Sequence, residues 1–249
     1  MALGYARHRP PVHGRVLELL EARAGTLRVG RALDIGCGAG LSTQMLLRRA
    51  SLAIGLDPSP SMVHWAKKLI PEAEFLAGAA EAIPLGSGTA DLVTAAGSLN
   101  YAEWEGFFSE TARVLTPAGR LIIYDFEPGR SFRDSPELDR WFEEFSSRYP
   151  WPQGDGQKVN PETLGAASEA FELDLQQRFE IPIAMINEAY VNYMMTETNV
   201  AGAIARGLPA EEISEWCRVS LRSIWNEEPR EILFHGYFAQ LRREPRERN

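Results

Sequence analysis

The stretch Arg31-Ala-Leu-Asp-Ile-Gly-Cys-Gly-Ala-Gly-Leu-Ser42 decides the fold of this chain. It combines a short apolar strand, an acid near the end of that strand and three alternate glycines, Gly36, Gly38 and Gly40. Glycine lets the backbone turn sharply and approach a ligand closely, because it has no Cβ. The following residues, 41–49, are predicted to form a helix, so a ligand would lie at the N-terminus of that helix.

The spacing of these glycines argues against a dinucleotide. The dinucleotide fingerprint is G-x-G-x-x-G. Counted from Gly36, its third glycine position holds Leu41, and glycine comes one place earlier, at Gly40. A loop that binds pyrophosphate is therefore disfavoured, and another nucleotide-like cofactor is favoured.

A second acid follows the next apolar segment. Ser51-Leu-Ala-Ile-Gly-Leu-Asp57 reads as a strand that ends in a carboxylate, 21 residues (57 minus 36) after Gly36. An acid at the end of the second strand is placed to bind ribose hydroxyls. Pro58-Ser-Pro-Ser-Met62 then begins another helix, with serines as caps and proline tolerated in the first turn.

The pattern D-x-G-x-G-x-G over residues 34–40 resembles the first motif of class I S-adenosylmethionine-dependent methyltransferases of the small-molecule type. Residues 78–85 and 113–124 resemble later motifs of that family, in the same order, so the resemblance covers residues 31–126. It implies S-adenosyl-L-methionine as cofactor and S-adenosyl-L-homocysteine as product. It also implies a cofactor site, with Met62 packed on the adenine, that comprises Asp34, Gly36, Gly38, Gly40, Asp57, Pro58, Met62, Ala79, Ala80, Glu81 and Gly97.

Position 79 departs from the family. Where the family usually has an aspartate that accepts a hydrogen bond from the adenine amino group, this chain has Ala79. A hydrogen bond to a charged group contributes about 1.5 to 3 kcal/mol, so its loss would weaken binding roughly ten- to a hundredfold. Either Glu81, main-chain groups and stacking replace it, or the use of the cofactor is altered.

The N-terminal stretch Tyr5-Ala-Arg-His-Arg-Pro10 resembles the entry segment of methyltransferases similar to the trans-aconitate type. In those enzymes the segment folds over the cofactor, which makes Tyr5 and Arg9 candidate cofactor-side residues. The alternative is that both are exposed residues of a loose terminus.

The order of elements predicts an α/β fold. Strands and helices alternate over residues 31–126 with short connections, which favours a Rossmann-like, doubly wound parallel sheet with the ligand at the carboxyl ends of its strands. Two later strands, around residues 171–175 and 232–238, bring the expected sheet to seven strands. The ligand-binding residues should therefore gather at one edge of the sheet.

A mainly helical lid is predicted around this core. Leu138, Trp141, Phe142 and Phe145 repeat at helical spacing opposite charged residues, and residues 187–226 also read as helix. We expect one methyltransferase domain over 1–249, with a cofactor-binding core at 31–126. Its helical cover over the substrate site would comprise 1–24, 127–170 and 187–228.

Composition restricts the partners. The net charge is −8, so the average field repels nucleic acids and anionic membranes, and no apolar run approaches the length of a membrane span. Two cysteines give neither a disulfide framework nor a metal-ligand cluster. We therefore expect a cytoplasmic protein with a small-molecule substrate, no metal, no nucleic acid and no membrane partner, and leave a homodimer open.

A general base is the least defined part of the prediction. Methyl transfer from a sulfonium depends mainly on alignment, but a hydroxyl or ammonium acceptor must also lose a proton. Any of the four histidines could serve, and His8 is favoured because its neighbours resemble the entry segment. Tyr101 and Glu103 follow the fourth strand, where a loop should face the transferable methyl. The alternatives are a packing tyrosine and a helix-capping glutamate.

The predicted function is S-adenosylmethionine-dependent methyl transfer to oxygen, nitrogen or carbon of a small organic acceptor. The alternative is a protein of the same fold that binds S-adenosylmethionine without transferring the methyl group. A protein substrate is a third reading, which a narrow cavity would oppose.

Overall fold

A computed structural model describes residues 7–152 and 159–244 of the chain. The chain divides into two compact units, each built from separate segments. The sheet unit comprises His13–Phe126, Asp155–Phe179 and Gly236–Asn249, and the helical unit comprises Met1–Val12, Glu127–Gly154 and Glu180–His235. Tyr5 lies outside the described residues, so its predicted role stays a prediction.

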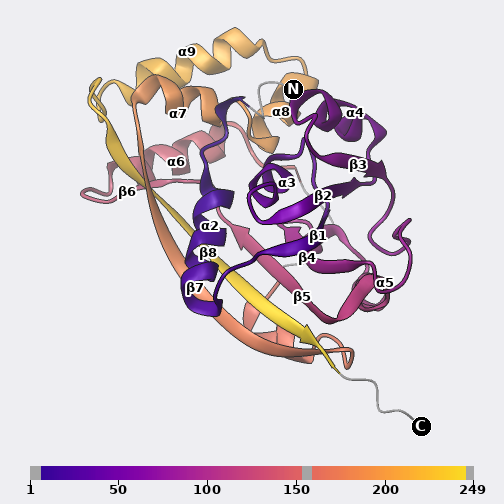
Figure 1. Cartoon of the computed structure of the whole chain (residues 1–249). Coiled ribbons are helices and arrows are strands. Elements are labelled where there is room, and N and C mark those ends of the chain that lie inside the picture. The colour runs from indigo at the N-terminus through magenta and orange to yellow at the C-terminus, as the bar shows by residue number, and fades with distance from the viewer. Residues whose placement is uncertain (1–6, 153–158, 245–249) are drawn as a thin grey trace. The chain divides into compact units, whose positions relative to one another are not determined.

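Five parallel strands form the centre of the sheet unit (Figure 1). Their order is β3-β2-β1-β4-β5, so the direction of crossover reverses between β1 and β4. Such a switch point is where open α/β sheets bind ligands, at the carboxyl ends of the strands. The strands are β1 (Val29–Ile35), β2 (Ala50–Asp57), β3 (Glu74–Ala77), β4 (Ala90–Ala96) and β5 (Leu115–Phe126).

Three later strands complete the sheet. β8 (Arg230–Arg243) runs antiparallel to β5, and β7 (Phe171–Met185) pairs with β8. β6 (Ser131–Phe132) pairs with the beginning of β8. The sheet thus has eight strands rather than the predicted seven. The additional strand, β6, has only two residues and leaves no alternating pattern in the sequence.

Helices of the sheet unit follow the signals in the sequence. They are α2 (Val12–Ala24), α3 (Leu41–Leu46), α4 (Pro60–Leu69) and α5 (Trp104–Val114), with short 3₁₀ turns at Leu99–Tyr101 and Pro161–Ala166. The predicted helix over 41–49 ends three residues early. Phe107 and Phe108 of α5 pack in one cluster with Leu33 of β1, and the last four residues of β1 are all buried, so both faces of this strand are covered, as is usual in parallel sheets.

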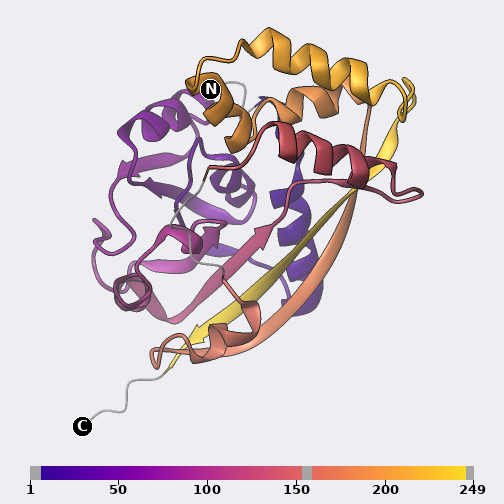
Figure 2. The ribbon, with the colours of Figure 1, turned by 180° about the vertical axis from the view of Figure 1, so that it is seen from behind.

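The helical unit includes α6 (Glu137–Arg148), α7 (Asn187–Met194), α8 (Thr198–Ala205) and α9 (Ala210–Leu221). Figure 2 shows α6 and α9 from behind. The predicted apolar stripe of α6 is buried, and Trp141 stacks on Phe145 (ring centroids 5.2 Å apart) and on Trp216 of α9 (5.7 Å). The aromatic stripe therefore forms the core of this unit.

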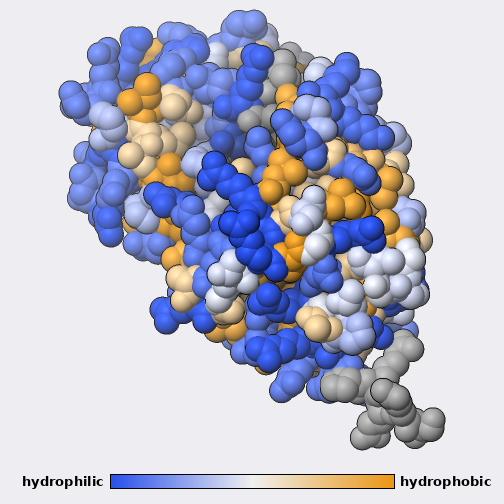
Figure 3. Space-filling model, in the orientation of Figure 1, coloured by the Kyte–Doolittle hydropathy of each residue, from blue (hydrophilic) through white to orange (hydrophobic). Residues whose placement is uncertain are grey.

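Hydrophilic residues dominate the face of the molecule drawn in Figure 3, with hydrophobic residues scattered among them. Within residues 7–152 and 159–244, none of the helices combines the length and the apolar character that a membrane crossing requires.

Candidate functional site

The glycine loop between β1 and α3 is shaped by its three glycines. Gly36, Gly38 and Gly40 all have positive φ, at 71°, 54° and 92°. A Cβ on Gly36 would lie 2.2 Å from the Cβ of Ser98, so packing against the loop after β4 excludes any side chain there. A Cβ on Gly38 would meet nothing within 4 Å. The backbone at Gly38 therefore faces open space, as a cradle for a ligand requires.

Asp34 lies beneath this loop and is fully buried. Its Oδ2 accepts hydrogen bonds from the hydroxyls of Ser42 (2.6 Å) and Thr43 (2.7 Å), and its Oδ1 accepts one from Thr94 (2.8 Å). Burial raises the pKa of Asp34, and the three hydroxyls oppose that rise. Asp34 thus joins β1 to the start of α3 and to β4, and it supports the loop from below.

Asp57 supports the same loop from the neighbouring strand. Its Oδ2 accepts a hydrogen bond from the backbone N–H of Gly38 (2.8 Å), and its Oδ1 accepts one from Ser59 (2.9 Å). The side chain is 8% exposed. Pro58 is exposed, and Met62 is half-buried in the first turn of α4. The predicted ribose-binding acid therefore lies at the glycine loop, beside two candidate cofactor residues.

The remaining candidate cofactor residues come directly after the carboxyl ends of β3 and β4. Ala79 is exposed and Ala80 is half-buried. Glu81 accepts a hydrogen bond from the backbone N–H of Glu103 (2.8 Å), so its carboxylate braces the start of α5. Gly97, with φ 66°, donates its N–H to the carbonyl of Tyr124 (2.8 Å).

The proposed catalytic residues lie in different units. Tyr101, in the sheet unit, is 82% exposed, so it is not a packing tyrosine. His8, in the helical unit, is exposed. Glu103 caps α5 by accepting hydrogen bonds from the N–H groups of Glu105 (2.8 Å) and Gly106 (2.7 Å), which confirms the capping alternative.

Arg9 is anchored within the helical unit. Its guanidinium forms an ion pair with Glu197 (3.1 Å), donates to the carbonyl of Thr196 (3.2 Å) and lies over the ring of Tyr193 (5.3 Å). Burial raises the pKa of Glu197, and the charge of Arg9 opposes that rise. Arg9 therefore ties the N-terminal segment to the turn between α7 and α8, so it is not a residue of a loose terminus.

Sequence reasoning missed a polar group at the ends of β4 and β5. Asn100 donates a hydrogen bond from its amide nitrogen to Oδ2 of Asp125 (2.9 Å). Nearby in the same unit, Nδ1 of His13 lies 2.9 Å from the hydroxyl of Tyr124. The available signal was that Asp125 is the first acid near the end of the fifth predicted strand, on the ligand-binding edge.

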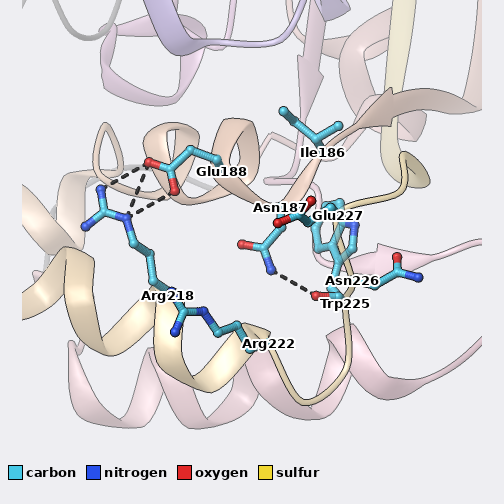
Figure 4. Close-up of a pocket in the computed structure, with 8 residues that line it drawn as sticks. All are labelled: Ile186, Asn187, Glu188, Arg218, Arg222, Trp225, Asn226 and Glu227. Carbon is cyan, nitrogen blue, oxygen red and sulfur yellow. Dashed lines mark hydrogen bonds and ion pairs between the residues drawn. The ribbon is translucent and has the colours of Figure 1, made fainter.

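A separate hollow of about 520 Å³ lies in the helical unit (Figure 4). Its charged lining is balanced, with two acids, Glu188 and Glu227, and two arginines, Arg218 and Arg222. Glu188 and Arg218 pair with each other at 3.1 Å. This lining gives no preference for either sign of charge. In the portion of the chain that the structure describes, no three His, Cys, Asp or Glu side chains gather as a metal site.

A glycine cradle at the switch point of a parallel sheet, braced by two acids, defines a Rossmann-like unit for a nucleotide-type cofactor. The family described as "Methyltransferase domain" matches residues 33–123. Residues 33–123 thus match a methyltransferase domain, as the sequence motifs predict.

Known proteins support this assignment. A demethylmenaquinone methyltransferase of Thermus thermophilus is 38% identical over 105 residues, 39% of this chain and 48% of the relative. An uncharacterized methyltransferase of Mycobacterium bovis is 33% identical over 117 residues, 47% of this chain and 46% of the relative. The chain spans about half the length of the curated relatives it matches.

Similarity of fold extends over most of the chain. The structure of a candidate type II methyltransferase from Anaeromyxobacter dehalogenans has a TM-score of 0.69 at 20% identity. It covers 94% of this chain and 96% of the other. At this identity the likeness shows the fold alone, including the strands and helices outside the matched domain.

Proposed function

We propose that this protein transfers the methyl group of S-adenosylmethionine to a small organic acceptor. The observation that carries the proposal is the glycine loop: Gly36 and Gly40 are fixed by packing, whereas Gly38 faces open space and is held by Asp57. A loop that is packed against the protein at two glycines and open at the glycine between them lets a ligand approach the backbone closely.

The residues present fit this cofactor by their chemistry. Asp57 supplies carboxylate oxygens for ribose hydroxyls at the end of β2, and Met62 supplies a half-buried apolar side chain for the adenine. When bound, the cofactor supplies an electrophilic methyl group on a positively charged sulfur. The protein contributes mainly by aligning it with the acceptor, which can lower a barrier by about 7 to 11 kcal/mol.

Calorimetric titration with S-adenosylmethionine and S-adenosylhomocysteine tests the cofactor assignment without the unknown acceptor. We expect micromolar binding of at least one. Asp57→Ala should weaken that binding by about 1.5 to 3 kcal/mol, because a charged hydrogen-bonding partner is lost. Since Asp57 also holds Gly38, the variant's thermal unfolding is compared with the wild type. A folded variant with unchanged affinity would show that Asp57 does not bind the ribose.

Ala79 favours a second candidate function, binding of S-adenosylmethionine without methyl transfer. It is exposed at the end of β3, where the family usually carries an adenine-binding aspartate. A broad panel of acceptors separates the two functions. Formation of S-adenosylhomocysteine with any one acceptor removes the second candidate, whereas binding with no product across the panel supports it.

A further inference from the structure

We infer that Asp125 is the acceptor-side carboxylate of this site, which receives the proton that a hydroxyl or amino acceptor loses on methylation, and that Asn100 positions it. This inference rests on the proposed function and identifies a residue and an acceptor class within it. The evidence is the contact of Asp125 with Gly97, beside the residue that packs on the glycine loop, and the hydrogen bonds that orient its carboxylate.

The placement follows from two close contacts between strand ends. Gly36 packs directly against Ser98, and an ideal Cβ on Gly97 would lie 3.0 Å from Oδ1 of Asp125. The Asp125 carboxylate therefore lies against Gly97, just after the end of β4, and β4 is the strand next to β1. Neighbouring strands lie about 4.8 Å apart, so Asp125 is about two strand spacings from β1.

The orientation of the carboxylate is fixed from both sides. Asn100 donates to Oδ2 at 2.9 Å, and the backbone N–H of Phe126 donates to Oδ1 at 2.8 Å. Asp125 is half-buried and pairs across the sheet with Tyr237 of β8. Burial raises the pKa of Tyr237, and the negative charge of Asp125 raises it further. A carboxylate held in this way presents a charge in a fixed direction.

The chemistry balances without a further reactant. A lone pair on the acceptor oxygen or nitrogen attacks the methyl carbon, the sulfur–methyl bond breaks, and its electron pair stays on sulfur as a neutral thioether. The acceptor's O–H or N–H bond gives its electrons to the heteroatom, and its proton passes to a carboxylate oxygen of Asp125. A weakly basic carboxylate suffices for a hydroxyl acceptor, because the methylated oxonium is strongly acidic. The proton then leaves to water.

A purely structural role for Asp125, holding the ends of β4 and β5 together, predicts a different effect on the affinities for a charged and a neutral ligand. If the carboxylate lies near the transferable methyl, Asp125→Asn should weaken S-adenosylmethionine, which carries a sulfonium charge, more than neutral S-adenosylhomocysteine. A unit charge roughly 8 Å away, at an effective dielectric constant of about 40, changes affinity about sixfold. A mere brace would change both affinities alike.

The first experiment is calorimetric titration of wild type, Asp125→Asn and a control with both ligands. The control is Asp91→Asn, which makes the same charge change near the start of β4, at the opposite edge of the sheet, where Asp91 accepts from Gly30 (3.1 Å) and Arg31 (2.9 Å). We expect a three- to tenfold loss for S-adenosylmethionine alone, and only in Asp125→Asn. If Asp125→Asn leaves both affinities unchanged, or weakens S-adenosylmethionine and S-adenosylhomocysteine equally, the inference is overturned. No binding to wild type removes the proposed function, and this inference with it.

The second experiment measures transfer of radiolabelled methyl to a panel of phenols, alkyl amines and hydroxy acids. General-base catalysis contributes about 10²- to 10⁴-fold, so Asp125→Asn should lower kcat by that range with little change in KM, and Asp125→Glu should restore part of it. Asn100→Ala should lower kcat less, and should have no added effect in Asp125→Asn. Full kcat in Asp125→Asn, or no transfer to any protic acceptor, overturns the proton-accepting role.

Discussion

The glycine loop of the sheet unit and the aromatic core of the helical unit are stabilised in different ways. In the loop, positive-φ glycines and the hydrogen bond from Gly38 to Asp57 hold the backbone, and Gly40 packs closely against Phe75. In the helical unit, stacked rings such as Trp141 and Phe145 fill a core. Adding one methyl group in the loop should therefore lower the free energy of unfolding as much as removing a whole ring from the aromatic core.

The largest effect is expected from adding one methyl group to the loop. Gly36→Ala would force alanine into a left-handed conformation, at about 1 to 2 kcal/mol, and would overlap Ser98, at about 1 to 3 kcal/mol. Together these give an expected loss of about 2 to 5 kcal/mol in the free energy of unfolding, measured by urea denaturation.

Gly38→Ala is the matched control, because its Cβ would meet no protein atom within 4 Å. This variant should fold with a loss of only about 1 to 2 kcal/mol from backbone strain. It should nevertheless bind S-adenosylmethionine poorly, since the new methyl group occupies the open side of the loop. Normal binding by Gly38→Ala would place the ligand elsewhere.

In the aromatic core, Phe145→Ala should cost about 3 to 4 kcal/mol in the free energy of unfolding. Phe145 is fully buried and packs against Trp141, Phe142 and Tyr149, with ring centroids 5.2, 5.8 and 5.5 Å apart. Phe145→Leu keeps most of the volume and should cost roughly half as much. Equal losses in the two variants would show that ring stacking, rather than filled volume, stabilises this unit.

A smaller loss is expected from Asp34→Asn, about 1 to 3 kcal/mol, because the amide nitrogen cannot accept a hydrogen bond from any of the three hydroxyls, whereas both oxygens of a carboxyl can. Burial raises the folded-state pKa of Asp34 above its unfolded value, so its favourable contribution is complete below about pH 4 and declines as pH rises through the raised pKa. The difference between wild type and variant should therefore be larger at pH 4.5 than at pH 8, as measured by urea denaturation. A difference that grows with pH would contradict the raised pKa.

In both regions the sequence predicted the locally determined feature. The loop was predictable because positive φ demands glycine and leaves a spaced pattern. The α6 stripe was predictable because burial follows helical periodicity. Two other features were not: the pair between Asn100 and Asp125 joins the 3₁₀ turn after β4 to the end of β5, 25 positions apart, and the anchor of Arg9 joins residues 188 apart. Such pairs depend on the packed structure and leave no local pattern.

The smallest predicted effect concerns Ala79, which stands where the family usually has an aspartate. Ala79→Asp would restore the expected acid at an exposed position after β3, where a new carboxylate meets no burial cost. A solvent-exposed hydrogen bond to the adenine amino group should raise the affinity for S-adenosylmethionine about three- to tenfold, which is below the usual range for a charged partner because water competes at this position. Glu81, whose Oε1 accepts from the N–H of Glu103, stays the alternative acid for this hydrogen bond. A titration with unchanged affinity would mean that the adenine is held by main-chain groups and by Met62, and that an acid at position 79 is dispensable to this loop.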